Sequence, residues 1–323
     1  MKFFSDLFRI DKSPKKGLLA VEWVIMGYLA FTLLLMLFTY TKLCSPVPML
    51  WGRVQILAMT AALWGVYRMI PCRFTMLCRI LAQLGLLSWW YPDTYEFNRM
   101  FPNLDDYFAT MEQQLFGCQP ALLFSQTFTS AWWSELMHLG YSCYYVLIAL
   151  VTLWYFIFRY EHFHRTAFII LTSFFIYYVI YIFLPVAGPQ YYYLAVGVND
   201  IAHGIFPNIH DYFATHQQAM TVPGWNGGFF YHIVESAHAA GERPTAAFPS
   251  SHVGVSTILL LLAWNSKNRR LFFSLLPFYI LLCLSTVYIQ AHYAVDVLGG
   301  WVSAVVLYFL LYFVYTRWIG EEK

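Results

Sequence analysis

A histidine and an aspartate stand four residues apart near the C-terminus, in the stretch Ser285-Thr-Val-Tyr-Ile-Gln-Ala-His292-Tyr-Ala-Val-Asp296. On a helix this spacing places both side chains on one face, one turn apart. A carboxylate placed there can bind one imidazole nitrogen, leave the other free and raise the basicity of the ring. Long apolar runs flank the stretch, and an ionisable pair at the edge of a membrane span predicts a functional site. A structural hydrogen bond between packed helices is the alternative.

A second polar cluster precedes this one and reads Arg243-Pro-Thr-Ala-Ala-Phe-Pro-Ser-Ser-His252. Pro followed by Ser is typical of a helix start. The first turn of such a helix binds anions, because its backbone N–H groups are free and the helix dipole is positive there. The cluster therefore predicts a phosphate site with Ser250, Ser251 and Arg243 as ligands and His252 beside it. The alternative is a capped helix that carries a buried neutral histidine.

The composition places both clusters in a membrane protein. Of the 323 residues 60% are hydrophobic and 11% are charged, whereas a soluble domain has about 25% charged residues. The net charge is +2 and the chain has no basic arm, so we expect no nucleic-acid partner. The six cysteines show no paired spacing, which argues against disulfides and a zinc site. We expect neither a metal ion nor another cofactor.

The apolar segments predict an all-α polytopic bundle of about six to eight spans, since a span needs about 20 residues. Two of the segments, 74–91 and 250–265, are short. We assign 1–91 to N-terminal spans and 92–323 to a catalytic membrane domain, with 187–249 as a folded outer cap. The eight segments are 18–40, 49–70, 74–91, 134–158, 166–186, 250–265, 271–290 and 293–316.

The basic residues predict the orientation of the chain. Every second connection carries Lys or Arg, and the first 16 residues are basic without the apolar core of a signal peptide. We therefore expect both termini in the cytoplasm. His252 then lies at the start of a span that runs inward, and His292 follows a span that runs outward. Both histidines are therefore expected at the outer membrane surface.

The outer connections contain a repeated sequence. Residues 101–110 read FPNLDDYFAT and residues 206–215 read FPNIHDYFAT. The apolar spacing predicts an amphipathic interfacial helix over 103–116 and a poorer copy over 208–219. Five of the ten histidines lie in 187–249, but their spacing matches no metal motif, so we interpret this connection as a folded cap.

Two of these stretches resemble motifs of a known family. Phe248-Pro-Ser-Ser-His252 and Ser285-x6-His292-x3-Asp296 are similar to the second and third motifs of the phosphatidic acid phosphatase type 2 superfamily, which usually read Pro-Ser-Gly-His and Ser-Arg-x5-His-x3-Asp. The wording around them most resembles the inositol phosphorylceramide synthase branch. The motifs cover 185–300, and the similar span layout reaches back to about residue 92.

The resemblance implies a phosphohistidine mechanism. His292 would attack phosphorus while Asp296 orients it, and His252 would protonate the leaving oxygen and later act as a base. Two cations of the family pattern are missing, because Thr286 and Gln190 stand where related proteins often have arginine. Gln190 and Arg243 are then the expected phosphate ligands outside the helix start.

The missing cations favour one of three functional hypotheses. A phosphodiester monoanion needs less positive charge than a phosphomonoester dianion. We therefore expect a lipid phosphotransferase that moves a phospho-headgroup, with phosphoinositol suggested by the resemblance, from a membrane lipid to a ceramide-like lipid alcohol. A lipid phosphate phosphatase with water as acceptor is the second hypothesis. A non-enzymatic scaffold or transporter is the third, and the presence of His252, His292 and Asp296 argues against it. The headgroup, the acceptor lipid and the oligomeric state stay open.

Overall fold

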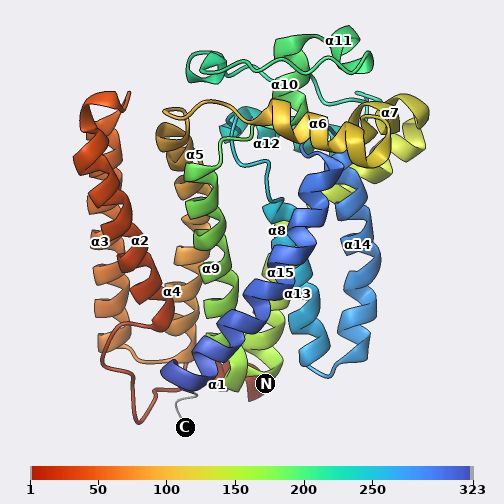
Figure 1. The fold of residues 1–323 in the computed structure, drawn as a ribbon. Helices are drawn as coiled ribbons and strands as arrows, with labels where there is room; N and C mark the ends of the chain where they lie inside the picture. The colour runs from red at the N-terminus through yellow and green to blue at the C-terminus, as the bar shows by residue number, and fades with distance from the viewer. Residues whose placement is uncertain (1, 321–323) are drawn as a thin grey trace.

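The computed structural model describes residues 2–320, and every regular element in that part of the chain is a helix (Figure 1). The N-terminal elements are α1 (Lys2–Leu7), α2 (Ala20–Thr39), η1 (Tyr40–Lys42), α3 (Pro46–Met69), α4 (Arg73–Gly85) and α5 (Leu87–Asn98). Of these, α2 to α5 stand together on one side of the molecule, and α1 lies at the end of the bundle near α4 (Figure 1).

The remaining chain forms a second group of long helices and a layer of short ones across one end (Figure 1). The long helices are α8 (Ala131–Phe158), α9 (Tyr160–Phe183), α13 (Ser251–Asn265), α14 (Arg269–Tyr288) and α15 (Ala294–Val314), which ends in η3 (Tyr315–Ile319). The short elements are α6 (Asp105–Phe116), α7 (Pro120–Thr127), α10 (Pro189–Val196), α11 (Val198–Ala202), η2 (Tyr212–Ala214) and α12 (Phe229–Gly241).

Within residues 2–320, six helices are long and apolar enough to cross a membrane: α2 with η1, α3, α8, α9, α14, and α15 with η3. This confirms the all-α bundle, at the lower end of the expected number of spans. Two expected segments differ. The segment at 250–265 is α13, whose 15 residues fall short of a full span. The segment at 74–91 is divided between α4 and α5 at Leu86, directly after Gly85, which is a poor helix former.

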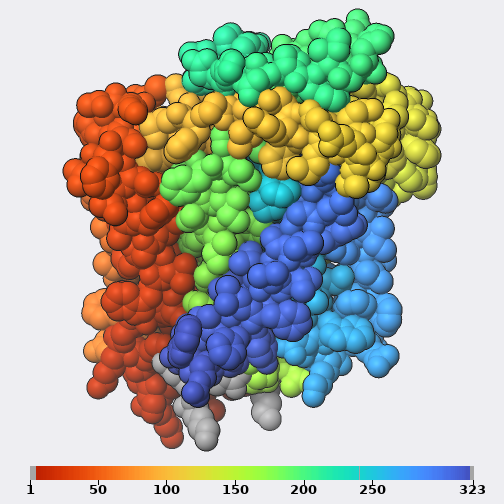
Figure 2. All heavy atoms as spheres, viewed as in Figure 1, coloured from red at the N-terminus to blue at the C-terminus, as the bar shows by residue number. Residues whose placement is uncertain are grey.

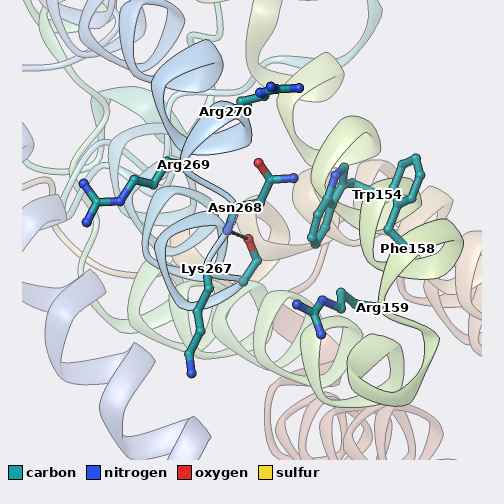
Figure 3. A pocket seen from close by; sticks show the side chains of 8 residues that line it. Trp154, Phe158, Arg159, Lys267, Asn268, Arg269 and Arg270 are labelled. Carbon is teal, nitrogen blue, oxygen red and sulfur yellow. Dashed lines mark hydrogen bonds between the residues drawn. The ribbon is translucent and has the colours of Figure 1, made fainter.

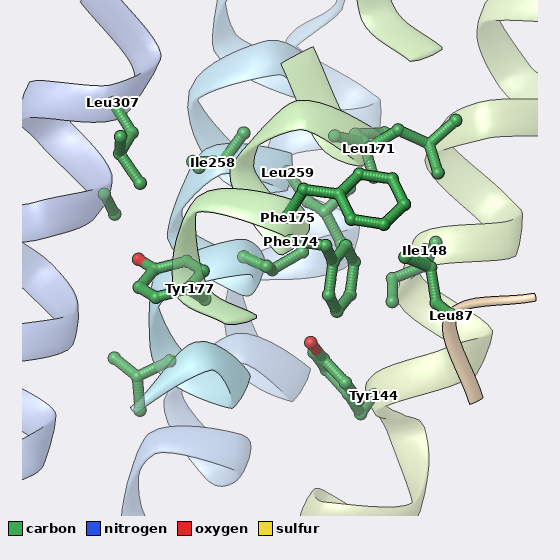
Figure 4. Packing of buried hydrophobic residues seen from close by; sticks show 14 of the residues in the cluster. Leu87, Tyr144, Ile148, Leu171, Phe174, Phe175, Tyr177, Ile258, Leu259 and Leu307 are labelled. Carbon is green, nitrogen blue, oxygen red and sulfur yellow. The ribbon is translucent and has the colours of Figure 1, made fainter. Parts of the chain in front are cut away.

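Helix α9 lies at the centre of the bundle. In its most apolar window 72% of the residues are buried, against 28% in α3 at the periphery. Figure 4 shows Phe174, Phe175 and Tyr177 of α9 among side chains from α8, α13 and α15. Because α9 contacts both helix groups, the N-terminal helices and the second group of long helices share one core.

Two buried ion pairs join the N-terminal helices. The guanidinium of Arg53 in α3 donates two hydrogen bonds to the carboxylate of Asp93 in α5, at 3.2 and 2.7 Å. Arg79 in α4 donates to Glu22 in α2 at 2.8 and 2.5 Å, and both side chains are fully buried. Charged side chains among membrane spans are costly unless they are paired. These pairs therefore fix which helices of this group lie side by side.

The two copies of the repeated sequence lie against each other. The backbone N–H of Asn103 donates to the carbonyl oxygen of His210 at 2.8 Å, and the side chain of Asn208 donates to Asp106 at 3.0 Å. The expected helix over 103–116 is confirmed as α6. The expected helix over 208–219 is wrong, because only Tyr212–Ala214 forms a single turn. His210 has a left-handed backbone (φ 50°), and Asn208 accepts its N–H, so the chain turns before a helix can begin.

The short helices form a layer over the end of the bundle where α13 begins and α14 ends. In the space-filling view this layer is a continuous band, with residues of about 190–220 above those of about 100–130 (Figure 2). Both termini lie at the opposite end (Figure 1). The connection 187–249 is therefore folded, with α10, α11, η2 and α12 as its regular elements.

Breaking one of the buried ion pairs will destabilise the N-terminal helices. Arg79→Met leaves the carboxylate of Glu22 buried without its partner, which costs about 3–5 kcal/mol. We expect a lower melting temperature in detergent micelles, measured by circular dichroism. The double variant Glu22→Gln/Arg79→Met should recover most of that loss, and Arg99→Ala, which breaks the partly exposed pair with Glu96 at 3.9 Å, should change little. Equal melting temperatures for Arg79→Met and the native protein would contradict a structural role of the pair.

Candidate active site

The two motif histidines meet at the covered end of the bundle. Nε2 of His292 lies 3.4 Å from Nδ1 of His252, and the ring centroids are 5.6 Å apart. His252 is the second residue of α13, and His292 lies in the short connection between α14 and α15. The structure thus brings together two side chains that stand 40 residues apart in the sequence.

His292 is oriented first of all by a backbone carbonyl. Its Nδ1 lies 2.8 Å from the carbonyl oxygen of Ala247 and 3.6 Å from Oδ2 of Asp296. Since a carbonyl oxygen can only accept, Nδ1 carries the proton and donates it, and the lone pair of Nε2 faces His252. Oδ2 of Asp296 accepts the backbone N–H of Tyr293 at 2.8 Å. Asp296 therefore shapes the loop around His292 and lies beside the ring, while Ala247 makes the shorter contact.

Burial keeps the His292 ring neutral. The residue is 4% exposed, and loss of water lowers its pKa to about 4. The carbonyl of Ala247 and the charge of Glu242 act in the opposite direction but do not outweigh the burial. A neutral imidazole with an exposed lone pair is the form that can attack phosphorus.

Aromatic rings hold His252 at the start of α13. Tyr141 stacks on the imidazole at a centroid distance of 4.7 Å and an interplanar angle of 25°, and Tyr144 lies at 4.3 Å. The hydroxyl of Ser250 accepts the N–H of Val253 as the expected helix cap. The backbone N–H of Ser250 donates to the backbone carbonyl of Asp296 at 3.1 Å. Ser250 thus serves the fold, while the neighbouring Ser251 is partly exposed.

The expected phosphate ligands outside the helix are arranged around a carboxylate. Gln190 donates from its amide to Oε2 of Glu242 at 2.9 Å, and Tyr141 donates to Oε1 at 3.2 Å. The guanidinium of Arg243 donates to the backbone carbonyl of Glu242 at 2.9 Å. Thr286 donates back to its own helix, to the carbonyl of Cys283. The charged side chain whose field acts on His292 is therefore Glu242, an anion, which the sequence interpretation did not include.

A fully buried aspartate of α6 connects the loops of the site. Asp105 accepts the backbone N–H groups of Ala187 and Gly188 at 2.7 and 2.8 Å. It also accepts the hydroxyl of Tyr293 at 3.0 Å and the side-chain amide of Asn103 at 2.6 Å. One carboxylate thus ties the loop before α10 to the residue that follows His292.

Gly188 allows the loop before α10 to approach the loop that carries His292. Its φ is +96°, and a Cβ there would lie 2.7 Å from the carbonyl oxygen of Ala291.

Glu112, two turns after Asp105, accepts the N–H of Val295 at 3.2 Å. Burial raises the pKa of Glu112 to about 8. The inner face of α6 thus supports both loops, a role that its amphipathic pattern alone did not reveal.

The fold and the histidine pair define a polytopic membrane protein with a candidate phosphoryl-transfer site. The sequence model of the PAP2 superfamily matches residues 106–310, which is more than half of the chain. The chain therefore belongs to the PAP2 superfamily, and this membership fits a lipid phosphatase or a lipid phosphotransferase. No curated protein and no solved structure matches the chain.

Loss of the Asp105 carboxylate will disturb the histidine loop. In Asp105→Asn an amide N–H₂ replaces one acceptor oxygen and faces N–H or O–H donors. Because small misplacements of reacting groups are costly, we expect headgroup release from a labelled lipid to fall about 10- to 100-fold in kcat with little change in KM.

The control for that variant is Asp106→Asn, which removes the same charge from α6 but contacts Asn208 away from the histidines. It should keep nearly native turnover. If both variants reduce kcat equally, the four contacts of Asp105 do not position the site.

The low pKa of His292 makes stability depend on pH. The folded protein resists protonation of this ring down to about pH 4, whereas the ring in the unfolded chain takes up its proton near pH 6.5. The unfolded state therefore binds more protons in this window, and the stabilising contribution is present above pH 6.5 and is lost as pH falls towards 4. Unfolding by sodium dodecyl sulfate, followed by circular dichroism, should show a smaller loss between pH 6.5 and 4 for His292→Asn than for the native protein. Parallel curves would contradict the low pKa.

Proposed function

We propose that the chain is a membrane lipid phosphotransferase that moves a phospho-headgroup onto a lipid alcohol through a phosphohistidine at His292. The observation that carries this proposal is the contact of 3.4 Å between Nε2 of His292 and Nδ1 of His252, with the opposite nitrogen of His292 fixed on the carbonyl of Ala247. This contact supports the proposal, because a nucleophile and an acid–base group must both reach the same phosphorus atom.

The first half-reaction forms the phosphohistidine. The phosphoryl group takes the place of the direct contact between the two rings, Nε2 of His292 attacks phosphorus, and the bond from phosphorus to the leaving lipid oxygen breaks. Burial lowers the pKa of His252 in the free site, and the negative charge of the bound phosphate acts in the opposite direction, so that the protonated ring supplies the proton to that oxygen. The proton of His292 stays on Nδ1 and is donated to the carbonyl oxygen of Ala247, which stabilises the positive ring of the intermediate.

The second half-reaction transfers the headgroup. His252, now neutral, takes the proton of a ceramide-like alcohol as its oxygen attacks phosphorus. The bond between phosphorus and Nε2 breaks, and both histidines return to their first state. Water in place of the lipid alcohol would give hydrolysis, so a phosphatase shares the first half of the reaction and is the second candidate.

The charges around the site favour a phosphodiester donor. Gln190 and Thr286 replace cations of the family pattern, and Gln190 binds the carboxylate of Glu242. An anion beside the nucleophile disfavours a phosphomonoester dianion more than a phosphodiester monoanion. Among phosphodiester headgroups we propose phosphoinositol, on the resemblance of the motifs. Arg243 would act at the edge of the site, since its guanidinium lies against the backbone of Glu242.

The alternation of basic connections supports an orientation for this reaction. Both termini lie at the end opposite the histidines (Figure 1). By the preference of basic loops for the cytoplasm, we propose that the termini are cytoplasmic and that the site opens at the outer face of the membrane. The lipid donor and the lipid acceptor would then both come from the outer leaflet.

The decisive assay supplies the purified protein with headgroup-labelled phosphatidylinositol, with and without ceramide, and in parallel with phosphatidic acid. We expect labelled phosphoinositol-ceramide to form only when ceramide is present, and little phosphate to be released from phosphatidic acid. Release of free phosphate from phosphatidic acid without a lipid acceptor would show that the protein is a phosphatase.

The control variant in this assay is His292→Ala. It should fold normally and lower turnover by orders of magnitude, because it lacks the nucleophile. Transfer at the native rate in that variant would rule out a phosphohistidine at this position.

A further inference from the structure

A hollow lies at the end of the bundle opposite the histidines, between the end of α8 and the turn that joins α13 to α14. Its volume is about 810 Å³, and it is open to the surroundings (Figure 3). Four of its lining side chains are cations, none is acidic, and two are aromatic. The lining residues are Trp154, Phe158, Arg159, Ser266, Lys267, Asn268, Arg269 and Arg270.

Three of these cations have no acidic partner in the described part of the chain, residues 2–320: Lys267, Arg269 and Arg270. Arg159 lies 3.6 Å from Glu161, but both side chains are about half exposed, so that pair leaves much of its charge available. By contrast, Arg53 and Arg79, which are buried among the N-terminal helices, are matched with carboxylates. Positive charge is therefore concentrated around the hollow, and Glu161 offsets only part of it.

The start of α14 adds to this positive potential. The side chain of Asn268 caps the helix by accepting the N–H of Leu271 at 3.1 Å. Arg269 and Arg270 occupy the first turn, where the helix dipole disfavours cations. This arrangement is less favourable than an acidic first turn, and a nearby anion would offset the difference, so the start of α14 also favours a negatively charged ligand.

Exposed aromatic side chains place the hollow at the level of lipid headgroups. Phe158 at the end of α8 is 65% exposed, and Trp264 on α13 and Phe273 on α14 are similarly open. These aromatic side chains extend the apolar outer surface of the bundle up to the cations that line the hollow. Rings of this kind gather where the hydrocarbon of a bilayer meets the headgroups.

We propose that this hollow binds the headgroup of an anionic phospholipid in the leaflet opposite the histidine pair. Its phosphodiester lies beside the cations that line the hollow, and Trp154 and Phe158 contact the adjoining glycerol and acyl chains. A free phosphate ion has the negative charge of the headgroup but no apolar chains, so contact with the two aromatic side chains favours the lipid over the ion. Basic residues that only fix the orientation of the chain need to lie on this side of the membrane, but they do not need to line a hollow.

The site is joined to the histidines by two helices. Helix α13 runs from the hollow to His252, and α14 runs from the hollow towards His292. A lipid that holds the turn between them limits the relative movement of these helices. Binding therefore stabilises the part of the fold that carries both rings, whatever reaction they perform.

The test measures lipid binding by the full-length protein, which needs no catalytic turnover. Native mass spectrometry and melting temperature in detergent micelles are recorded with added phosphatidylglycerol, phosphatidylcholine, or glycerol 3-phosphate as the soluble anion. The variant Lys267→Gln/Arg269→Gln/Arg270→Gln is compared with Lys12→Gln/Lys16→Gln/Arg317→Gln, which removes three charges from the same end of the molecule but outside the hollow.

We expect phosphatidylglycerol to bind and to raise the melting temperature, and the other two additives to have little effect. The hollow variant should bind phosphatidylglycerol roughly 100-fold more weakly, because each neutralised cation near a lipid phosphate costs about a factor of five. The control variant should bind nearly as the native protein does. If both variants bind phosphatidylglycerol equally weakly, binding depends on general surface charge and not on the hollow. If glycerol 3-phosphate raises the melting temperature as much as phosphatidylglycerol does, the ligand is a free anion. Either result overturns the proposal. Should the hollow variant fail to fold, Arg269→Lys/Arg270→Lys, which keeps the charge, must bind as the native protein does.

Discussion

The structure depends on bringing two imidazole rings into contact where a membrane bundle ends. The contact joins Nε2 of His292 to Nδ1 of His252, and one ring sits in a loop while the other starts a helix. A buried polar ring is stable only if its remaining nitrogen has a partner. The carbonyl of Ala247 fills that role for His292, and the tyrosine rings of α8 hold His252. The elements around the pair can be understood as the supports of this contact.

The supports reach the pair from several parts of the chain. Helix α6 holds the loops through Asp105 and Glu112, α13 presents His252, and the segment before α13 supplies the carbonyl of Ala247. Central helix α9 holds the start of α13, since the hydroxyl of Tyr181 donates to the carbonyl of Pro249 at 2.8 Å and accepts the N–H of Ser251. Buried polar groups with several partners hold one geometry, which is what a reaction at one phosphorus atom needs.

The electrostatics of the site separate it from the usual pattern of the superfamily. Amide and hydroxyl side chains, Gln190 and Thr286, stand where cations are common, and Glu242 binds Gln190. Both side chains are already engaged within the protein, Gln190 with Glu242 and Thr286 with its own helix, so the site holds a helix start and one carboxylate but lacks these two cations. The proposed preference for a singly charged phosphodiester rests on this difference, because family membership alone does not fix the substrate.

Local patterns in the sequence predicted much of the fold and the centre of the site. Apolar runs predicted the long helices, and the alternation of basic connections, with the family resemblance, predicted that His252 and His292 lie together. The spacing could not show the support by Asp105, since its partners at Ala187 and Tyr293 lie 82 and 188 residues away. Nor could it show that Arg243 turns to the backbone of Glu242, because spacing does not determine where a long side chain points. The expected helix over 208–219 failed for a local reason, the left-handed backbone of His210.

The central claim is that His292 carries the phospho-headgroup between donor and acceptor. The most direct measurement is rapid quenching of the protein with headgroup-labelled phosphatidylinositol in the absence of an acceptor, followed by peptide mass spectrometry under alkaline conditions that preserve phosphohistidine. The account predicts label on the peptide that contains His292, bound at Nε2, and its disappearance when ceramide is added. Label on another residue, or transfer with no labelled peptide at any time, would contradict it.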